Sequence, residues 1–459
     1  MSTSTPSRFG VLRYRNFRYL LIDRFVAPSA FAFSAVGVSF AVLANTGSTA
    51  DLSYVLAAQI APNLVFGPLG GVIADRIPPQ YVIAFANLLV ALCEGTLGLL
   101  VLTHSAHLWQ MIALEAGTGT AIAIFYPASQ GLLPKLVPES ELQQANAISR
   151  LVMNAAMMGG AAIAGFLVAA SGPGWALIID AIGMAASVAP NLLIRVRAIE
   201  RAHNPGVFSE LREGWDEFRS HTWLWGIVLQ YSAVLMCWYG SFSVLGPAVA
   251  KAHLGGPAAW GTIMAFESIG LIVGGFIALR YTPRRPMLFV AMIGATIALP
   301  SLALAMLWPV WLICATSFGV GIALETMMVQ WFVVMARYIP ADKLARVSAY
   351  DALGSVMSMP IGALLAGPIA AAIGVSNTQY AAAGVIVAVS LLTLLSRDIR
   401  TRRSTDTPVS GAQVAGPAEV AGGTAAAADI AVAVNIADVP VASTTAQSGL
   451  SAAAISSDA

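Results

Sequence analysis

The heptapeptide GGVIADR at residues 70–76 returns as GGFIALR at residues 274–280, 204 positions further along a chain of 459 residues. Three more correspondences share almost the same offset of 202: WQMIA (109–113) with WLICA (311–315), PESELQQANA (138–147) with PADKLARVSA (340–349), and Gly165 with Gly367. One offset common to four separate places predicts that the chain consists of two copies of a single unit.

The composition places both copies in a membrane. Of the residues, 58% are hydrophobic and only 10% are charged, whereas soluble domains carry about 25% charged residues. The three cysteines, Cys93, Cys237 and Cys314, all lie within apolar runs and have neither disulfide nor metal-ligand spacing. We therefore expect no metal and no cofactor, and we interpret the long apolar runs as spans that face lipid.

Twelve apolar runs are long enough to cross a bilayer as helices, for which about 20 residues suffice. Barrel strands would be about half as long and would alternate with polar residues. The twelve predicted spans are 19–43, 52–74, 81–102, 108–128, 145–170, 174–194, 222–249, 258–280, 287–306, 309–334, 345–370 and 377–396. The predicted fold class is thus an all-α integral membrane protein with two halves of six helices each.

Basic residues fix the predicted orientation, because cytoplasmic loops are enriched in Lys and Arg. With both termini in the cytoplasm, only Lys251 falls in an outer loop and only Arg24 lies deeper within a span, since Arg150, Arg280 and Arg346 stand at the inner ends of theirs. The predicted organisation is a cytoplasmic N-terminus (1–18), a six-helix bundle (19–194), a cytoplasmic linker with an amphipathic helix or a solvated turn (195–221), a second bundle (222–396) and a disordered cytoplasmic tail (397–459).

Two parallel halves of six spans each, together with four sequence segments, resemble a known family. The loop GGVIADRIPPQ, the wider run LAAQIAPNLVFGPLGGVIADR, and the segments LLPKLVPESELQQANAISR and TGSTADLSYVLAAQ resemble the major facilitator superfamily. Within it they resemble the bacterial efflux branch of enterobactin exporters and macrolide-efflux proteins, over residues 10 to about 396. The resemblance implies a monomer in the cell membrane that exports a small amphipathic compound (a drug, antibiotic or siderophore) by alternating access, in antiport with protons.

The repeated loop departs from the family pattern in two ways. Pro79 and Gln80 stand where one or two arginines are usual, and Leu279 replaces the acid in the second copy. The resemblance places Asp75 near the start of span eleven, where Arg346 could pair with it as a latch; the alternative is an aspartate that only shapes a tight loop. The predicted conformational loop residues are Gly71, Asp75, Arg76, Arg280, Arg284, Arg285 and Arg346.

Small residues mark close helix contacts. In MGGAAIAGF (158–166), Gly160 and Gly165 match the antiporter signature of the family, but Ala161 replaces its proline. Gly367 is the counterpart of Gly165 in the second half. Small residues allow helices to approach closely in a membrane, and this packing role accounts for the glycines without any antiport function.

Seven acidic residues lie within predicted spans: Asp23, Glu94, Glu115, Asp180, Glu267, Glu325 and Asp351. An ionised side chain at the centre of a bilayer costs about 2.5–3.5 kcal/mol, and Arg24 is the one basic residue deeper within a span. Most of these acids are therefore protonated, hydrated or near a membrane edge. The family arrangement favours Glu115 and Glu325 as proton carriers, then Asp23 and Glu267; a structural hydrogen-bonding role is the alternative for each.

The substrate cavity is predicted from polar and aromatic residues of the spans that line it in the family. The candidates are Arg24, Trp225, Trp238, Gln230 and Gln330. Aromatic rings stack on flat or cationic groups, although rings near span ends also anchor proteins at the interface. A cavity with many acids and few bases suits cationic or neutral amphiphiles.

Other functions lack a sequence signal. No nucleotide-binding loop and no set of His or Cys with catalytic or metal spacing is present, so neither an enzyme nor a nucleic-acid partner is expected. The remaining alternatives are an importer or a uniporter of another small molecule, and a non-transporting membrane sensor.

Overall fold

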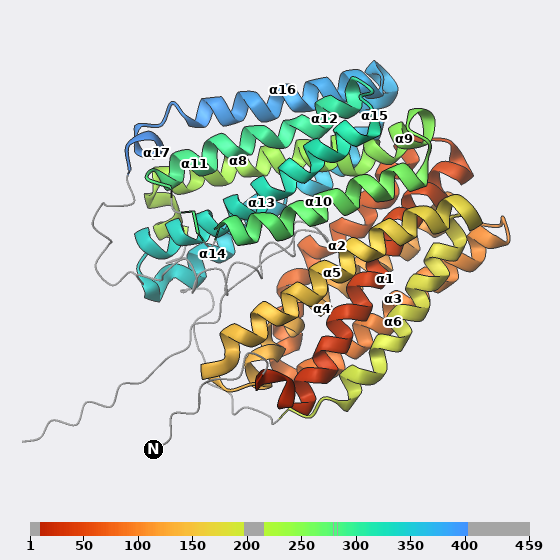
Figure 1. Ribbon diagram of the computed structural model, residues 1–459, viewed down its shortest axis with the longest axis horizontal. Coiled ribbons are helices and arrows are strands. Elements are labelled where there is room, and N and C mark those ends of the chain that lie inside the picture. The colour runs from red at the N-terminus through yellow and green to blue at the C-terminus, as the bar shows by residue number, and fades with distance from the viewer. Residues whose placement is uncertain (1–9, 197–214, 279, 282, 403–459) are drawn as a thin grey trace, which may run out of the picture.

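The computed structural model describes residues 10–196, 215–278, 280–281 and 283–402, and the regular structure within these residues is helical throughout (Figure 1). Two bundles lie side by side, the first built from α1 to α6 and the second from α8 to α17. The chain therefore has the all-α membrane fold that the apolar runs predict. The predicted N-terminus (1–9) and most of the tail (403–459) lie outside the described residues.

The helix bounds follow the predicted spans closely. The first bundle contains η1 (Gly10–Arg13), α1 (Arg15–Thr46), α2 (Thr49–Arg76), α3 (Pro79–Leu102), α4 (Leu108–Leu132), η2 (Leu133–Lys135), α5 (Glu139–Ser171) and α6 (Pro173–Leu193). The second contains α8 (Thr222–Trp238), η3 (Tyr239–Val244), α9 (Leu245–His253), α10 (Pro257–Ala278), α11 (Pro286–Ile293), η4 (Gly294–Ile297), α12 (Ala298–Ala305), α13 (Val310–Tyr338), α14 (Ala341–Val356), α15 (Met359–Ile373), α16 (Val375–Thr393) and α17 (Arg397–Thr401).

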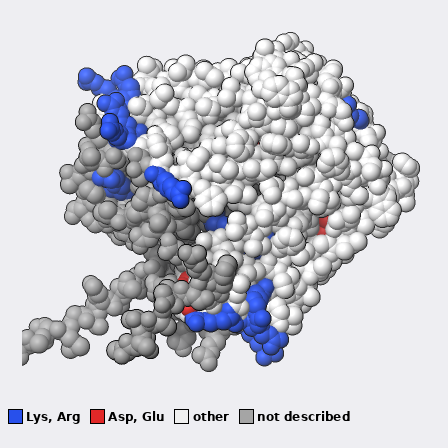
Figure 2. Space-filling view, in the orientation of Figure 1, with Lys and Arg blue, Asp and Glu red and all other residues white. Residues whose placement is uncertain are grey.

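Ten helical units among the described residues are long and apolar enough to cross a membrane. The other two predicted spans correspond to α2 and to the pair α14–α15, of which α15 is a shorter apolar helix. Figure 2 shows Lys and Arg gathered mainly toward the end of the molecule at which the described chain begins and ends. We call this end the terminal side and the opposite end the far side.

Single-residue turns repeat between the two halves. Gly172 joins α5 to α6 with φ of 88°, and Gly374 joins α15 to α16 with φ of 90°. Glycine adopts this left-handed backbone without the clash that a Cβ would cause. The two turns are 202 residues apart, so the offset found in the sequence extends to backbone geometry.

Three spans predicted as continuous runs are broken in the structure. The seventh contains the π-helical turn η3, the ninth contains the turn η4, and the eleventh divides between α14 and α15. Each break lies just before a proline: Pro247, Pro300 and Pro360. Proline lacks an N–H and its ring crowds the carbonyl four residues earlier. The crowded carbonyl lies within η3 and η4 in the first two breaks, and at Val356, the last residue of α14, in the third.

The halves meet through two pseudo-equivalent helix pairs, α5 with α10 and α2 with α15. Gly165 and Gly261 face each other across the first pair; a Cβ added to Gly165 would lie 2.9 Å from the Cα of Gly261. In the second pair, a Cβ on Gly367 would lie 2.5 Å from the carbonyl oxygen of Thr49. Both contacts lie toward the far side, where the halves are therefore closed against each other.

Adjacent glycines in α5 provide a stability test. A Cβ on Gly160 would lie 2.7 Å from the carbonyl oxygen of Ser29 in α1, whereas nothing lies within 4 Å of a Cβ on Gly159. We expect Gly160→Ala to destabilise the protein by about 1–3 kcal/mol through overpacking, and Gly159→Ala to be neutral or slightly stabilising because alanine favours helix. Thermal melting of the two purified variants measures this; equal melting temperatures would contradict the close α1–α5 contact.

The end of the linker packs on the terminal side of the second bundle. Residues 215–220 are helical, and the rings of Trp215 and Phe218 lie 5.5 and 6.1 Å from the ring of Tyr350 in α14. Glu217 accepts a hydrogen bond of 2.8 Å from Lys343 Nζ and lies 3.0 Å from His221 Nε2. The rest of the predicted amphipathic helix lies outside the described residues.

This docking should depend on pH. The hydrogen bond from Lys343 is the main cause that lowers the pKa of Glu217 below its ordinary value of 4.5. A lowered pKa stabilises the docked state above the ordinary value, and the stabilisation is lost as pH falls through the lowered pKa. For a partly exposed pair we expect no more than about 1 kcal/mol.

Hydrogen exchange at residues 215–220, corrected for intrinsic rates, should therefore show protection that falls below the ordinary glutamate pKa. Glu217→Gln should remove this dependence, while Asp216→Asn, at the exposed neighbouring carboxyl, should keep it. A pH-independent wild type would show that the ion pair does not hold the segment.

Candidate functional site

A cluster of three carboxyl groups lies in the core of the first bundle. Glu94 of α3, Glu115 of α4 and Asp180 of α6 are each 0% exposed. The carboxyl of Glu94 lies within electrostatic range of both Glu115 and Asp180. Among the described residues no Lys or Arg forms an ion pair with any of the three. We call these residues the acid cluster.

Neutral donors surround the acid cluster only in part. Glu94 accepts hydrogen bonds from Ser34 Oγ of α1 (3.0 Å) and Thr118 Oγ1 of α4 (3.3 Å), and Glu115 accepts one from Gln59 Nε2 of α2 (2.7 Å). Within the described part of the chain, both carboxyl oxygens of Asp180 lack a hydrogen-bond partner. Three neighbouring carboxylates without a cation repel one another strongly at low dielectric. The arrangement is chemically suited to holding protons.

Asp23 occupies a different environment. Its Oδ1 accepts hydrogen bonds from Asn87 Nδ2 of α3 (3.1 Å), from Asn191 Nδ2 of α6 (2.7 Å) and, at short range, from Ser187 Oγ of α6. Three donors from two helices fix this carboxyl in place and tie α1 to α3 and α6. The geometry therefore favours the structural alternative for Asp23 over proton carriage.

Arg24, the next residue of α1, lies within electrostatic range of Asp23 but makes its hydrogen bonds elsewhere. Its Nη2 donates a hydrogen bond of 2.7 Å to Ser129 Oγ of α4, and its Nη1 lies 3.8 Å from Met153 Sδ of α5. Its Nε is buried and has no hydrogen-bond partner among the described residues. The side chain thus lies between α4 and α5 as a partly exposed cation.

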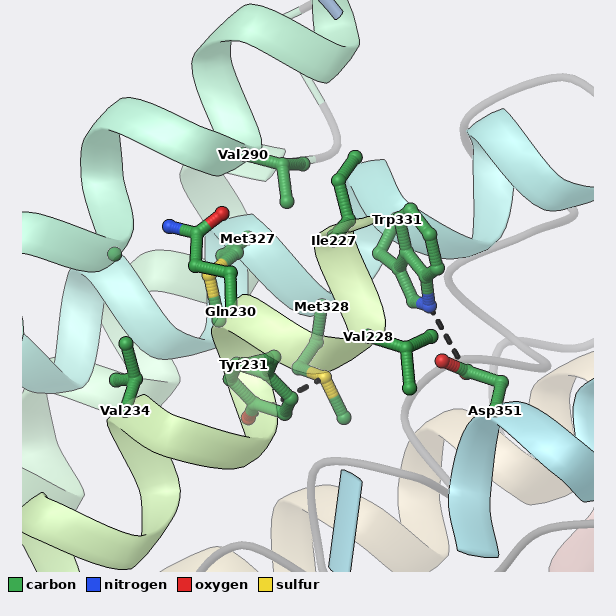
Figure 3. Close-up of a pocket in the computed structure, with 11 residues that line it drawn as sticks. Ile227, Val228, Gln230, Tyr231, Val234, Val290, Met327, Met328, Trp331 and Asp351 are labelled. Carbon is green, nitrogen blue, oxygen red and sulfur yellow. Dashed lines mark hydrogen bonds between the residues drawn. The ribbon is translucent and has the colours of Figure 1, made fainter. Parts of the chain in front are cut away.

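The second bundle contains a pocket between α8, α11, η4, α13 and α14 (Figure 3). Gln230, Tyr231, Met327 and Met328 line it, and Trp331 Nε1 donates a hydrogen bond of 2.9 Å to Asp351 Oδ2 at its edge. Gln230 Nε2 also donates to the carbonyl oxygen of Ala291 and to Ser390 Oγ. The pocket therefore combines a mostly apolar, sulfur-rich wall with a few fixed polar groups. The sequence prediction missed Tyr231 and used Asp351 only as one acid among seven.

The remaining acid candidates lie where α10 and α13 cross. Glu325 of α13 is 8% exposed, and Glu267 of α10 is 4% exposed. Glu325 packs against Gly274 and lies within electrostatic range of Tyr231. Glu267 Oε2 lacks a hydrogen-bond partner among the described residues. The structure brings neither residue into the acid cluster.

The other cavity candidates lie apart from one another. Trp225 is 43% exposed near the start of α8, while Trp238 is 4% exposed and stacks on Phe242 at 5.8 Å. Gln330 Nε2 donates to the carbonyl oxygen of Tyr281 in the loop after α10. Of the four cavity candidates in the second bundle, only Gln230 lines the pocket.

The conformational loop is described only in part. Arg280, Arg284 and Arg285 are exposed on the terminal side. The described side chains do not include those of Asp75, Arg76 and Arg346, and nothing beyond its place in α2 is described for Gly71. Nothing placed here bears on the predicted contact between Asp75 and Arg346. No group of His, Cys, Asp or Glu suited to a metal ion occurs among the described residues.

Two duplicated helical bundles that cross a membrane, packed on each other at one side with buried carboxyls between helices, have the architecture of membrane transporters with internal repeats. The sequence model of the Major Facilitator Superfamily matches residues 25–307. The chain belongs to this family, and it is a multi-pass membrane transporter rather than an enzyme.

Similar proteins include two exporters and one transporter of known structure. Macrolide efflux protein A of Streptococcus pyogenes is 22% identical over 385 residues, covering 80% of this chain and 93% of that protein. The enterobactin exporter of Salmonella choleraesuis (strain SC-B67) is 25% identical over 403 residues, covering 86% and 95%. A crystal structure of the nucleoside transporter NupG has a TM-score of 0.68 at 12% identity, covering 83% and 99%. The last likeness concerns the fold alone.

Proposed function

We propose that the protein exports a small amphipathic compound across the cell membrane in exchange for protons. The acid cluster is the observation that carries the proton part of the proposal: three fully buried carboxyls lie within electrostatic range of one another, and no cation is paired to them among the described residues. Export is supported by the relatives, two of which are named for efflux. In this proposal Glu115 and Glu94 carry the protons, and Asp180 receives or supplies one.

The proposed cycle is alternating access by a monomer. Both termini and the linker face the cytoplasm, which makes the terminal side the inner side. The contacts at Gly165 and Gly367 close the outer side, and the halves rock about a site between them. The bundles comprise residues 19–194 and 222–396, and the Asp75–Arg346 contact latches the opposite state.

Transport in everted vesicles tests the proposal. Purified protein would be reconstituted, a pH gradient imposed with the acid inside, and a panel of fluorescent acidic, neutral and cationic amphiphiles followed together with an acridine-type proton indicator. We expect at least one amphiphile to enter while protons leave. Uptake without proton movement would indicate a uniporter, and transport in the reverse direction would indicate an importer.

A further inference from the structure

One charged residue of the first bundle, Arg24, has only neutral hydrogen-bond partners, although Asp23 lies within electrostatic range of it. Arg24 makes its hydrogen bonds to the hydroxyl and carbonyl of Ser129, at 2.7 and 3.4 Å, and touches the sulfur of Met153. A guanidinium has five N–H donors, and these neutral partners occupy only part of them. Among the described residues Arg24 forms no ion pair. An arginine within a span is rare, costly to bury, and by default a functional residue.

The face of α1 that carries Arg24 is accessible. Pro28, Phe31 and Ala35 follow it at helical spacings of three and four residues, which places all four side chains on one stripe. Arg24, Pro28 and Phe31 are partly exposed and Ala35 is exposed. The neighbouring stripe through Asp23, Ala27, Ala30 and Ser34 is buried against the rest of the bundle. This exposed stripe begins at Arg24, which contacts both α4 and α5, and its exposure lets it meet a ligand.

The acids of the same bundle are turned away from this stripe. Asp23 is held by donors from α3 and α6, and the acid cluster is fully buried. Arg24 is therefore the charged group that this stripe of α1 offers to a ligand, even though the spans contain more acids than bases. This departs from the expectation, drawn from residue counts, of a cavity for cationic or neutral amphiphiles.

We propose that Arg24, positioned by Ser129, binds an acidic oxygen group of the transported amphiphile, such as a carboxylate or a phenolate. The inference rests on the proposed transport of an amphiphile and names its chemical class. A guanidinium binds a carboxylate by charge-assisted hydrogen bonds, and Arg24 is partly exposed and has N–H donors beyond those that bond to Ser129. The apolar body of the same compound would lie along Pro28, Phe31 and Ala35.

Matched probes separate the charge of a ligand from its shape. Labelled naphthylacetate, its methyl ester and naphthylethylamine would be titrated onto the full chain in nanodiscs, with empty nanodiscs subtracting partition into lipid. We expect the acid to bind at least about tenfold more tightly than the ester, since a hydrogen bond to a charged group is lost in the ester. Equal binding of acid and ester, preference for the amine, or no binding of any probe would overturn the inference.

Variants then assign the preference to Arg24. Arg24→Gln should weaken binding of the acid about 10- to 100-fold and leave the ester within about twofold. Arg24→Lys should keep part of the preference, and Ser129→Ala should reduce it; these two guard against a folding defect in Arg24→Gln. A loss shared equally by acid and ester would show that Arg24 only shapes the bundle. Binding needs no pH gradient, so the binding test can be interpreted even if proton-driven export fails. The transport test can likewise be interpreted if the acidic probe does not bind.

Discussion

Replacing Glu94 and Glu115 together by glutamine is expected to abolish proton-driven transport while leaving gradient-free exchange of the substrate intact. Glutamine keeps the size and hydrogen-bonding capacity of glutamate but cannot release a proton. The hydrogen bonds from Gln59 and Ser34 can still form in the variant, so we expect the bundle to fold. Each single variant should reduce accumulation at least about tenfold, as for loss of a positioned proton-transfer group.

The measurement uses vesicles with and without a pH gradient. Accumulation against a concentration gradient reports proton coupling, and exchange between equal substrate pools reports binding and access alone. Asp398→Asn is the matched control, because this carboxyl is half exposed and lies on α17 of the second bundle, outside the acid cluster. Undiminished accumulation in the double variant would remove the acid cluster from the mechanism and transfer the proposal to Glu325 or Glu267.

The fold was largely predictable because its determinants are local. Apolar run length and basic loops define spans, and the sixth span, predicted at 174–194, is α6 at Pro173–Leu193. The repeat offset then predicts which helices correspond. The breaks before Pro247, Pro300 and Pro360 were missed, since hydropathy does not register a displaced carbonyl. The chain contains other prolines within helices, such as Pro28 and Pro127, that leave α1 and α4 unbroken.

The acid cluster forms because particular faces of α3, α4 and α6 turn inward. The sequence of an apolar membrane helix gives little indication of which face that is. The family arrangement favoured Glu115 as a proton carrier and did not favour Glu94. One signal was available: α3 and α4 are joined by the short turn 103–107, and both glutamates lie about two and a half helical turns from it. Residues equally far from the turn of a helical hairpin lie at the same depth.

The exposure of Arg24 likewise depends on which face of α1 turns inward. Counting charges within spans gave an acidic cavity, yet burial placed the acids of the first bundle in its interior and left the arginine accessible. Residue counts give the cost of placing charge in a membrane, whereas the orientation of each side chain decides which charge a ligand meets.

The second large effect is expected at the contacts that close the far side. Gly165→Leu should force α5 away from α10, because a Cβ alone would already lie 2.6 Å from the carbonyl oxygen of Pro257. Gly367→Leu should do the same to α15 and α2, and both variants should lose transport at least about tenfold. Gly159→Leu is the matched control in α5, since a Cβ there meets nothing within 4 Å.

Spin labels on exposed Ser171 and His253, after replacement of the three cysteines, measure the opening directly. We expect the distance between them to lengthen in Gly165→Leu, as the helices separate toward the ordinary interaxial spacing of about 8–10 Å, and to stay unchanged in Gly159→Leu. Lengthened distances together with normal transport would show that closure of the far side is not required for the cycle. Gly165 and Gly367 are one of the four correspondences that indicated duplication. Equal effects at both would show that the repeat preserves a working contact, and an effect at one alone would show that the halves have diverged in how they close.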